Sequence, residues 1–174
     1  MQEIEVKILE IDRDEIEKKL LALGAEKYFE GEMRAVYYDA ADGHIHQQGD
    51  ALRLRKEGSK TVLTYKRAIS RQGAKIMEEC ETEVASMENM QQILSLLGFK
   101  PLKETRKFRT SYLLEGCSVV IDEYTGALAH IPPFIEVEAT ELGRMQAVVK
   151  RLGYTPEACK SWSTYELVQH YQKN

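Results

Sequence analysis

The sequence predicts an α+β domain in which about eight antiparallel strands form an open sheet or a barrel, with helices packed outside. Several segments alternate polar and apolar residues with a period of two, as half-buried strands do; they span residues 35–39, 51–56, 61–66, 105–114 and 118–124. Most links between them are of hairpin length and contain glycine, which favours antiparallel pairing. No linker rich in proline, glycine or serine divides the chain, so we expect one domain over residues 1–174.

Three passages repeat one pattern, a short strand with alternating glutamates followed by an amphipathic helix that ends in Leu-Gly. The strands are expected at 3–8, 81–84 and 135–138, and the helices at about 12–23, 87–97 and 140–152. Asp12 and Ser86 are the predicted N-caps, and the glycine after each helix supplies the left-handed C-terminal residue. The apolar stripe of the second helix is Met90, Ile93, Leu94 and Leu97. We expect each stripe to pack on the apolar face of the sheet.

The charge balance limits the classes of partner. The chain has 24 Lys and Arg against 28 Asp and Glu, a net charge of −4, which argues against a broad basic surface for nucleic acid. No segment approaches the ~18 apolar residues needed to span a bilayer, and no signal peptide is visible, so we expect a cytoplasmic protein with no membrane partner. Cys80, Cys117 and Cys159 are interpreted as reduced thiols, and the apolar parity of Cys80 predicts core packing.

Side-chain parity sorts the predicted strands into an apolar face and a charged face. The charged set comprises Glu3, Glu5, Lys7, Arg53, Arg55, Lys66, Glu79, Glu81, Glu83, Lys107, Arg109, Asp122, Glu136 and Glu138. An antiparallel sheet with one solvated side would explain this alternation. The alternative is a barrel with the charged face inside, which requires the charges to be paired, hydrated or bound to a charged ligand. Arg and Lys hold phosphate oxygens, and carboxylates hold the Mg²⁺ or Mn²⁺ that bridges those oxygens.

A series of strand motifs in this order resembles a known family. They are Glu3-x-Glu5-x-Lys7, Tyr37-Tyr38-Asp39, Leu52-Arg53-Leu54-Arg55, Leu63-Thr64-Tyr65-Lys66, Glu81-x-Glu83-Val84, Lys107-x-Arg109-x-x-Tyr112, Asp122 and Phe134-Ile135-Glu136-Val137-Glu138. Together they resemble the CYTH superfamily, or triphosphate tunnel metalloenzymes, which includes class IV adenylyl cyclases and thiamine triphosphatases. One Glu-x-Glu-x-Lys triplet is weak evidence, but the ordered set covers nearly the whole chain.

The resemblance implies an eight-stranded antiparallel barrel that binds a triphosphate inside and requires Mg²⁺ or Mn²⁺. By position, the implied phosphate ligands are Lys7, Arg53, Arg55, Lys66, Lys107 and Arg109. The implied metal ligands are Glu3, Glu5, Asp122, Glu136 and Glu138, and catalysis is assigned to Lys7, Glu5 and Glu138. Further candidate site residues are Glu81, Glu83 and Tyr38. The resemblance also allows a homodimer, because relatives in the cyclase branch are often dimers.

Three functions are compatible with these residues. The leading hypothesis is a metal-dependent triphosphatase acting on tripolyphosphate, ATP or thiamine triphosphate, because phosphoryl transfer needs mainly positioning and charge stabilisation. The first alternative is a class IV adenylyl cyclase, in which the ribose 3′-hydroxyl of ATP attacks the α-phosphorus and pyrophosphate leaves. The second is a module that binds a phosphorylated ligand without turnover. The sequence contains no clear base-reading motif beyond scattered aromatic residues, which favours cleavage without cyclisation.

Four other features are given structural interpretations. His44 and His46 are placed in a turn, and the lack of a nearby third histidine or cysteine argues against zinc. His130 is interpreted as a loop histidine, and residues 67–75 as a solvated basic hairpin tip. Trp162 is expected to dock a C-terminal helix onto the barrel.

Overall fold

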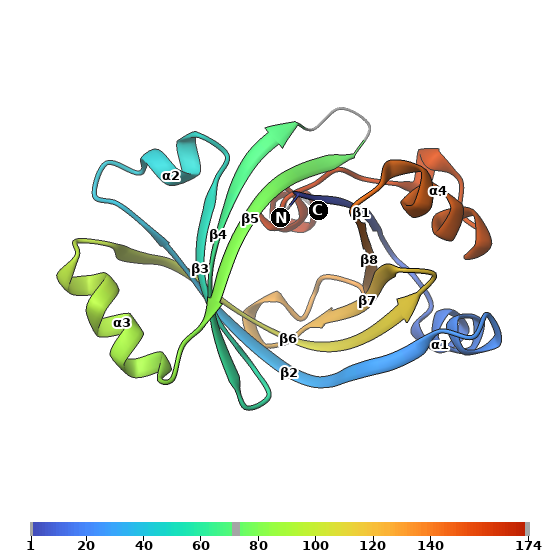
Figure 1. Ribbon diagram of the computed structural model, residues 1–174, viewed down its shortest axis with the longest axis horizontal. Helices are drawn as coiled ribbons and strands as arrows, with labels where there is room; N and C mark the ends of the chain where they lie inside the picture. Colours follow the sequence, from blue (N-terminus) through green and yellow to red (C-terminus); the bar gives the residue numbers. More distant parts are fainter. Residues whose placement is uncertain (1, 71–73, 173–174) are drawn as a thin grey trace.

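Eight strands close into an antiparallel barrel in a computed structural model that describes residues 2–70 and 74–172 (Figure 1). The strand order around the barrel is β1-β5-β4-β3-β2-β6-β7-β8. The strands are β1 (Gln2–Ile8), β2 (Glu26–Asp39), β3 (Ala51–Glu57), β4 (Lys60–Ser70), β5 (Lys75–Glu83), β6 (Lys100–Leu114), β7 (Cys117–Tyr124) and β8 (Phe134–Ala139). The predicted α+β class and the antiparallel barrel are therefore confirmed.

Strand β1 closes the barrel because it pairs with a different strand on each side. On one side Glu5 lies opposite Lys75 of β5, and on the other it lies opposite Glu138 of β8. Lys7 lies opposite Glu136 in the same β1–β8 pair. Closure thus brings the two Glu-x-Glu strands side by side, an arrangement that an open sheet need not produce.

The helices lie outside the barrel (Figure 1). They are α1 (Arg13–Ala22), α2 (His44–Gln47), α3 (Met87–Leu96), α4 (Leu142–Arg151) and α5 (Thr164–Gln172), with 3-10 turns at Gly126–Leu128 and Pro156–Ala158. Two predicted N-caps are confirmed, because Asp12 accepts a hydrogen bond from the Glu15 amide and Ser86 accepts one from the Asn89 amide. The three predicted Leu-Gly ends are also confirmed, with φ values of 80°, 90° and 85° at Gly24, Gly98 and Gly153.

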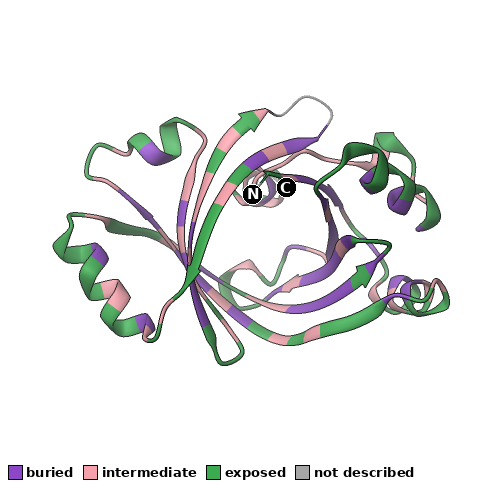
Figure 2. Ribbon diagram, viewed as in Figure 1, coloured by how far each residue is buried: buried purple, intermediate pink, exposed green. Residues whose placement is uncertain are grey.

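The hydrophobic core lies between the outer face of the barrel and the helices, so the apolar residues of the strands point outward. Figure 2 marks buried residues on both the strands and the helices. The largest cluster packs α1 and α4 against β1, β7 and β8, with Leu20 and Val148 fully buried against residues such as Val137. A second cluster packs α2 and α3 over β2 and β3. Because the apolar side chains are buried under the helices, the alternate, charged side chains of each strand face the barrel interior.

Some local predictions are wrong. Ile93 and Leu97 of the predicted stripe are 46% and 67% exposed, whereas its other two members, Met90 and Leu94, pack on the barrel together with Met87. Cys80 is exposed, since its outward-facing neighbours Glu78 and Thr82 are also exposed and no helix covers this part of β5. The turn predicted around His44 is the short helix α2. Within the predicted hairpin tip, residues 71–73 lie outside the described residues, and Lys75 is buried.

The C-terminal segment runs back to the barrel. Lys160 exchanges two backbone hydrogen bonds of 2.8 Å with Lys7 of β1. Beyond it, α5 docks through Leu167, which is fully buried beside Phe134 in a third cluster that also contacts Trp162. The predicted docking of a C-terminal helix is therefore confirmed. Within residues 2–70 and 74–172, no helix is long and apolar enough to cross a membrane.

Candidate functional site

The barrel encloses a cavity of about 570 Å³ lined by the inward-facing charged residues. Its lining reaches from Tyr28 near the start of β2 to Tyr38 near its end, so the cavity follows the length of the barrel. All six predicted phosphate ligands line it: Lys7, Arg53, Arg55, Lys66, Lys107 and Arg109. The acidic lining residues are Glu3, Glu5, Glu79, Glu81, Glu136 and Glu138 from the predicted charged set, together with Asp39, Asp50, Glu57 and Glu166. The closed-barrel interpretation of the charged face is thus the one that the fold supports.

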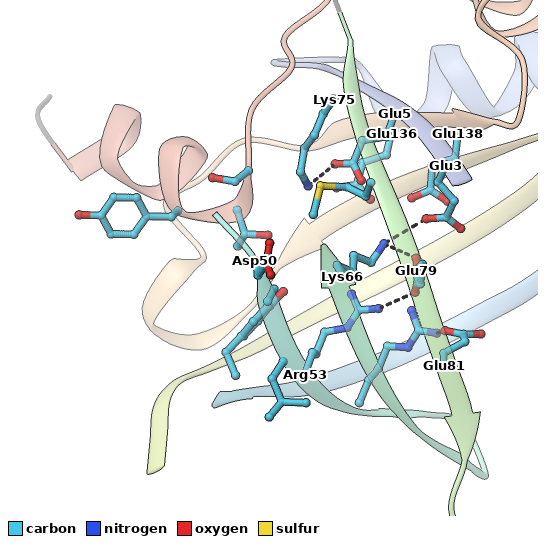
Figure 3. Close-up of a pocket in the computed structure, with 18 of the residues that line it drawn as sticks. Glu3, Glu5, Asp50, Arg53, Lys66, Lys75, Glu79, Glu81, Glu136 and Glu138 are labelled. Atoms are coloured by element: carbon cyan, nitrogen blue, oxygen red, sulfur yellow. Dashed lines mark hydrogen bonds and ion pairs between the residues drawn. The ribbon is translucent and has the colours of Figure 1, made fainter. Parts of the chain in front are cut away.

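Lys7 is held between carboxylates of the two neighbouring Glu-x-Glu strands. Its Nζ atom lies 2.6 Å from Glu5 Oε1 and 2.9 Å from Glu136 Oε1. Lys75, which the sequence analysis assigned to the hairpin tip, also approaches Glu5 at 3.2 Å (Figure 3). Burial raises the pKa of Glu5, but the charges of Lys7 and Lys75 outweigh it and leave the pKa at about 2. Glu5 and Glu136 are therefore ionised partners of a buried ammonium group.

Glu3 and Glu138 have a different electrostatic environment. Burial and a hydrogen bond shared with Glu79 raise the pKa of Glu3 to about 7, against the opposing charge of Lys66. Burial and the nearby Glu136 carboxylate raise the pKa of Glu138. Lys66 lies 3.2 Å from Glu3 and 2.6 Å from Glu79, as Figure 3 shows. These two carboxyls are the acidic groups that would gain most from an added cation.

Arg53 and Arg55 each carry a buried guanidinium nitrogen, the Nε atom, that makes no hydrogen bond to any described residue. The carboxylates nearest Arg55 lie 3.4 Å away on Glu57 and 3.7 Å away on Glu81, and Arg53 approaches Glu79 only to 3.9 Å. Burial and repulsion from Arg53 lower the pKa of Arg55. Unsatisfied donors of this kind are unfavourable unless an anion accepts their hydrogen bonds.

Asp122 does not occupy the place predicted for it. Its side chain is fully buried, and it accepts hydrogen bonds from Lys107 and from Arg109, whose Nε lies 2.7 Å from Oδ1. Arg109 also contacts Glu136 at 2.8 Å. Asp122 does not line the cavity, and its oxygens are engaged by two cations. In this structure the Asp122 carboxylate pairs with Lys107 and Arg109, and its predicted metal-ligand role stays a prediction.

Two further candidates also differ from expectation. Glu83 is 61% exposed at the end of β5, lies 3.9 Å from Lys60 and does not line the cavity. Tyr38 packs in the second apolar cluster, because its parity on β2 points outward, although it also contributes to the cavity lining. Glu81 keeps a place in the lining through its contact with Arg55. His130 is exposed and lies outside the lining, as the loop interpretation predicts.

Tyr37 is the inward-facing tyrosine that the sequence analysis missed. It lies opposite Arg53 in the β2–β3 register and lines the cavity. Burial raises its pKa, but Arg53, Lys103 and Lys107 outweigh this effect and lower the pKa to about 8. The Nζ atom of Lys103 lies 4.7 Å from the ring centroid. Strand parity could have identified this residue, because Tyr37, and not Tyr38, lies on the same inward face as Arg53.

The residues fit a divalent metal in donor chemistry. Carboxylate oxygens are the ligands that Mg²⁺ and Mn²⁺ prefer, and Glu138 makes no hydrogen bond or ion pair with the described part of the chain. In the described ranges, no three His, Cys, Asp or Glu side chains are already arranged as a metal site. Lys7 and Lys66 hold several of the carboxylates in ion pairs instead.

Comparisons with known proteins agree with this geometry. A model of the CYTH domain family matches residues 1–148. A Methanocaldococcus jannaschii protein named "Putative adenylate cyclase" is 30% identical over 138 residues, which cover 79% of this chain and 77% of that protein. A Pyrococcus horikoshii structure superposes with a TM-score of 0.80 at 25% identity, over 95% of this chain and 98% of that one. A Hippeastrum protein, a "Putative adenylyl cyclase" with a dominant triphosphatase activity, shares the fold with a TM-score of 0.70 at 21% identity, over 97% and 95% of the two chains.

Proposed function

The chain belongs to the CYTH domain family, and from this premise we propose that it is a divalent-metal-dependent triphosphatase. The observation that carries the proposal is that Arg53 and Arg55, whose buried Nε atoms make no hydrogen bond to the described residues and whose nearest carboxylates lie 3.4 Å or more away, line a cavity that also contains the Glu-x-Glu strands. A triphosphate supplies several anionic oxygens in a row, so it can satisfy these donors and bridge to a cation at the carboxylates.

The basic residues divide into free and restrained groups. Arg53 and Arg55 can donate hydrogen bonds to phosphate oxygens, because their own carboxylate contacts are long, at 3.9 and 3.4 Å. Arg109 and Lys107 are held in place by the buried Asp122. In this proposal Lys107 and Arg109 fix the position of the phosphates, and Arg53 and Arg55 bind the phosphate oxygens.

The acidic residues would hold the metal. Glu3 and Glu138 are assigned as ligands because their raised pKa values reflect carboxyl groups in need of a positive charge. Glu136 adjoins them and orients Lys7, which stays cationic beside the phosphates because Glu136 and Glu5 raise its pKa against the effect of burial. When bound, the metal supplies Lewis-acid polarisation of the phosphate oxygens and of the attacking water.

Adenylyl cyclisation is the second candidate, because the Methanocaldococcus jannaschii relative carries the name of a cyclase. The two reactions need the same triphosphate clamp but different nucleophiles. Hydrolysis needs only water near a phosphorus atom, whereas cyclisation needs the ribose 3′-hydroxyl in line with the α-phosphorus. The fold resemblance to a protein with dominant triphosphatase activity supports hydrolysis as the first choice.

One assay separates these functions. The purified protein is incubated with tripolyphosphate, ATP or thiamine triphosphate in Mg²⁺ or Mn²⁺, and the products are resolved. Orthophosphate release is expected. Formation of cyclic AMP and pyrophosphate would refute the hydrolase hypothesis and support the cyclase. Tight binding of a triphosphate without any product would support a non-catalytic binding module.

The matched variants are Glu136→Gln in the cavity and Glu104→Gln on the outer surface, where Glu104 pairs with Arg34 and Arg106. Only the first is expected to abolish metal-dependent turnover. Equal activity in both variants would contradict the assigned site.

A further inference from the structure

The end of the cavity between α2 and α5 differs from the charged interior. His46 of α2 and Tyr165 of α5 both line it, with ring centroids 5.0 Å apart and ring planes at 66°. Aliphatic side chains of Ile45 and Leu52 lie in the same lining, and Asp50 marks this end in Figure 3. The lining at this end also includes the carboxylates of Asp50 and Glu166. Carboxylates repel an inorganic phosphate, whereas the aromatic and aliphatic side chains suit a planar organic group.

Both rings are carried by anchored backbone. Asp39 is almost fully buried, and its carboxylate accepts hydrogen bonds from the amides of Ile45 at 3.1 Å and His46 at 2.9 Å. At the start of α5, Ser163 and Glu166 cap each other reciprocally, with the Ser163 amide donating to Glu166 at 2.7 Å and the Glu166 amide donating to Ser163 Oγ at 3.3 Å. These contacts anchor the backbone segments that carry both rings.

The ring pair is next to the phosphate-binding residues. Tyr37 faces Arg53 across the β2–β3 pair, and the side chain of Thr164, adjacent to Tyr165, interacts with Tyr37 and contributes to its lowered pKa. A group attached to a triphosphate clamped at Arg53 would therefore emerge between α2 and α5. Tyr165 is 48% exposed, which leaves ring surface available for stacking.

From this geometry we infer that the substrate is an organic triphosphate whose aromatic heterocycle stacks at His46 and Tyr165, and that these two residues set its selectivity over tripolyphosphate. The inference rests on the proposed triphosphate site, and it holds whether hydrolysis or cyclisation follows. Any planar aromatic ring attached to the triphosphate presents a face to Tyr165, so the claim made here is the role of His46 and Tyr165 in selectivity. The cavity volume of about 570 Å³ lies within the ~300–1,000 Å³ typical of sites for organic ligands.

The test compares kcat/KM for ATP, thiamine triphosphate and tripolyphosphate in the wild type and in a His46→Ala/Tyr165→Ala double variant. We expect the wild type to prefer one organic triphosphate. In the double variant the ratio of kcat/KM for that substrate to kcat/KM for tripolyphosphate should fall at least about tenfold, mainly through KM. The organic triphosphate whose kcat/KM ratio to tripolyphosphate falls more in the double variant is the one whose ring stacks at His46 and Tyr165. An unchanged ratio would overturn the inference.

The controls keep the same two helices intact. His44→Ala alters α2 at an exposed residue outside the cavity lining, and Tyr171→Phe alters α5 away from the opening. Neither should change the ratio, and a fall equal to that of the double variant would also overturn the inference.

Calorimetric titration of ATP, thiamine triphosphate and tripolyphosphate without metal separates this inference from the proposed function. If none of the three is turned over, the proposed function fails. Tighter binding of an organic triphosphate than of tripolyphosphate, lost in the double variant, would still support the stacking site. Equal binding of all three ligands by the wild type would refute it.

Discussion

Replacing Arg55 by methionine should stabilise the ligand-free protein. An unsatisfied buried donor costs about 1–3 kcal/mol, and the Arg55 Nε is such a donor on a side chain that is 15% exposed. Its ion pairs with Glu57 and Glu81 are long, at 3.4 and 3.7 Å, and contacts of this kind contribute at most about 1 kcal/mol. The net gain in free energy of unfolding is therefore about 1 kcal/mol, or roughly 2–4 °C in Tm for a domain of this size.

The same change in a partnered arginine should have the opposite sign. Arg109 binds the fully buried Asp122 and contacts Glu136, and loss of one partner of a buried ion pair costs about 3–5 kcal/mol. Arg109→Met is thus the matched variant, with the same substitution on the same face of the barrel. The two variants differ in the sign of the stability change because Asp122 accepts hydrogen bonds from Arg109 in the ligand-free protein, whereas the Arg55 Nε makes none with the described residues.

Urea unfolding followed by the fluorescence of Trp162, the single tryptophan, measures both free energies. The kinetic consequence is separate, since loss of a charged hydrogen bond worth about 1.5–3 kcal/mol should lower kcat/KM of Arg55→Met roughly 10- to 100-fold. An Arg55→Met variant that is no more stable than the wild type would contradict the prediction, and so would an Arg109→Met variant as stable as the wild type.

Three other predictions concern the acidic residues and Tyr37. Glu5→Gln, like Glu136→Gln, should abolish metal-dependent turnover while circular dichroism shows an intact fold; retained activity in both variants would refute the acidic site. Phenolate absorbance should show one tyrosine titrating near pH 8, absent in Tyr37→Phe and shifted upward by tripolyphosphate, because the anion offsets the cations that stabilise the phenolate. A titration unaffected by the anion would contradict that placement. In the metal-free protein, Glu3 has a pKa of about 7 when folded against 4.5 as its ordinary value, so its stabilising contribution is complete below pH 4.5 and is lost as pH rises through 7. Thermal unfolding should show this loss relative to Glu3→Gln, and a constant difference across that range would count against it.

Strand parity predicted most of the site. Because successive side chains alternate faces, a correct strand assignment places Arg53 and Arg55 inside together with Lys107 and Arg109. The same rule extended along β5 from Glu79 would have placed Lys75 inside. In the tyrosine motif an error of one residue in the strand register exchanges the inward-facing Tyr37 for the outward-facing Tyr38.

Other features depend on tertiary contacts that local patterns do not contain. Asp122 has the parity of the charged set, and no local pattern shows that its buried carboxylate pairs with both Lys107 and Arg109. His46 lay in a segment predicted as a turn, and only the docking of α5 brings Tyr165 against it. The exposure of Ile93 likewise follows from how α3 is rotated on the barrel.

The central claim is that the charged interior of the barrel is a triphosphate site, and a crystal structure with tripolyphosphate and Mn²⁺ tests it most directly. The account predicts phosphate density inside the barrel, with oxygens accepting hydrogen bonds from Arg53 and Arg55, and an anomalous Mn²⁺ peak beside Glu3 and Glu138. Triphosphate bound only on the outer surface, or an interior ligand that leaves both arginines without contacts, would contradict it.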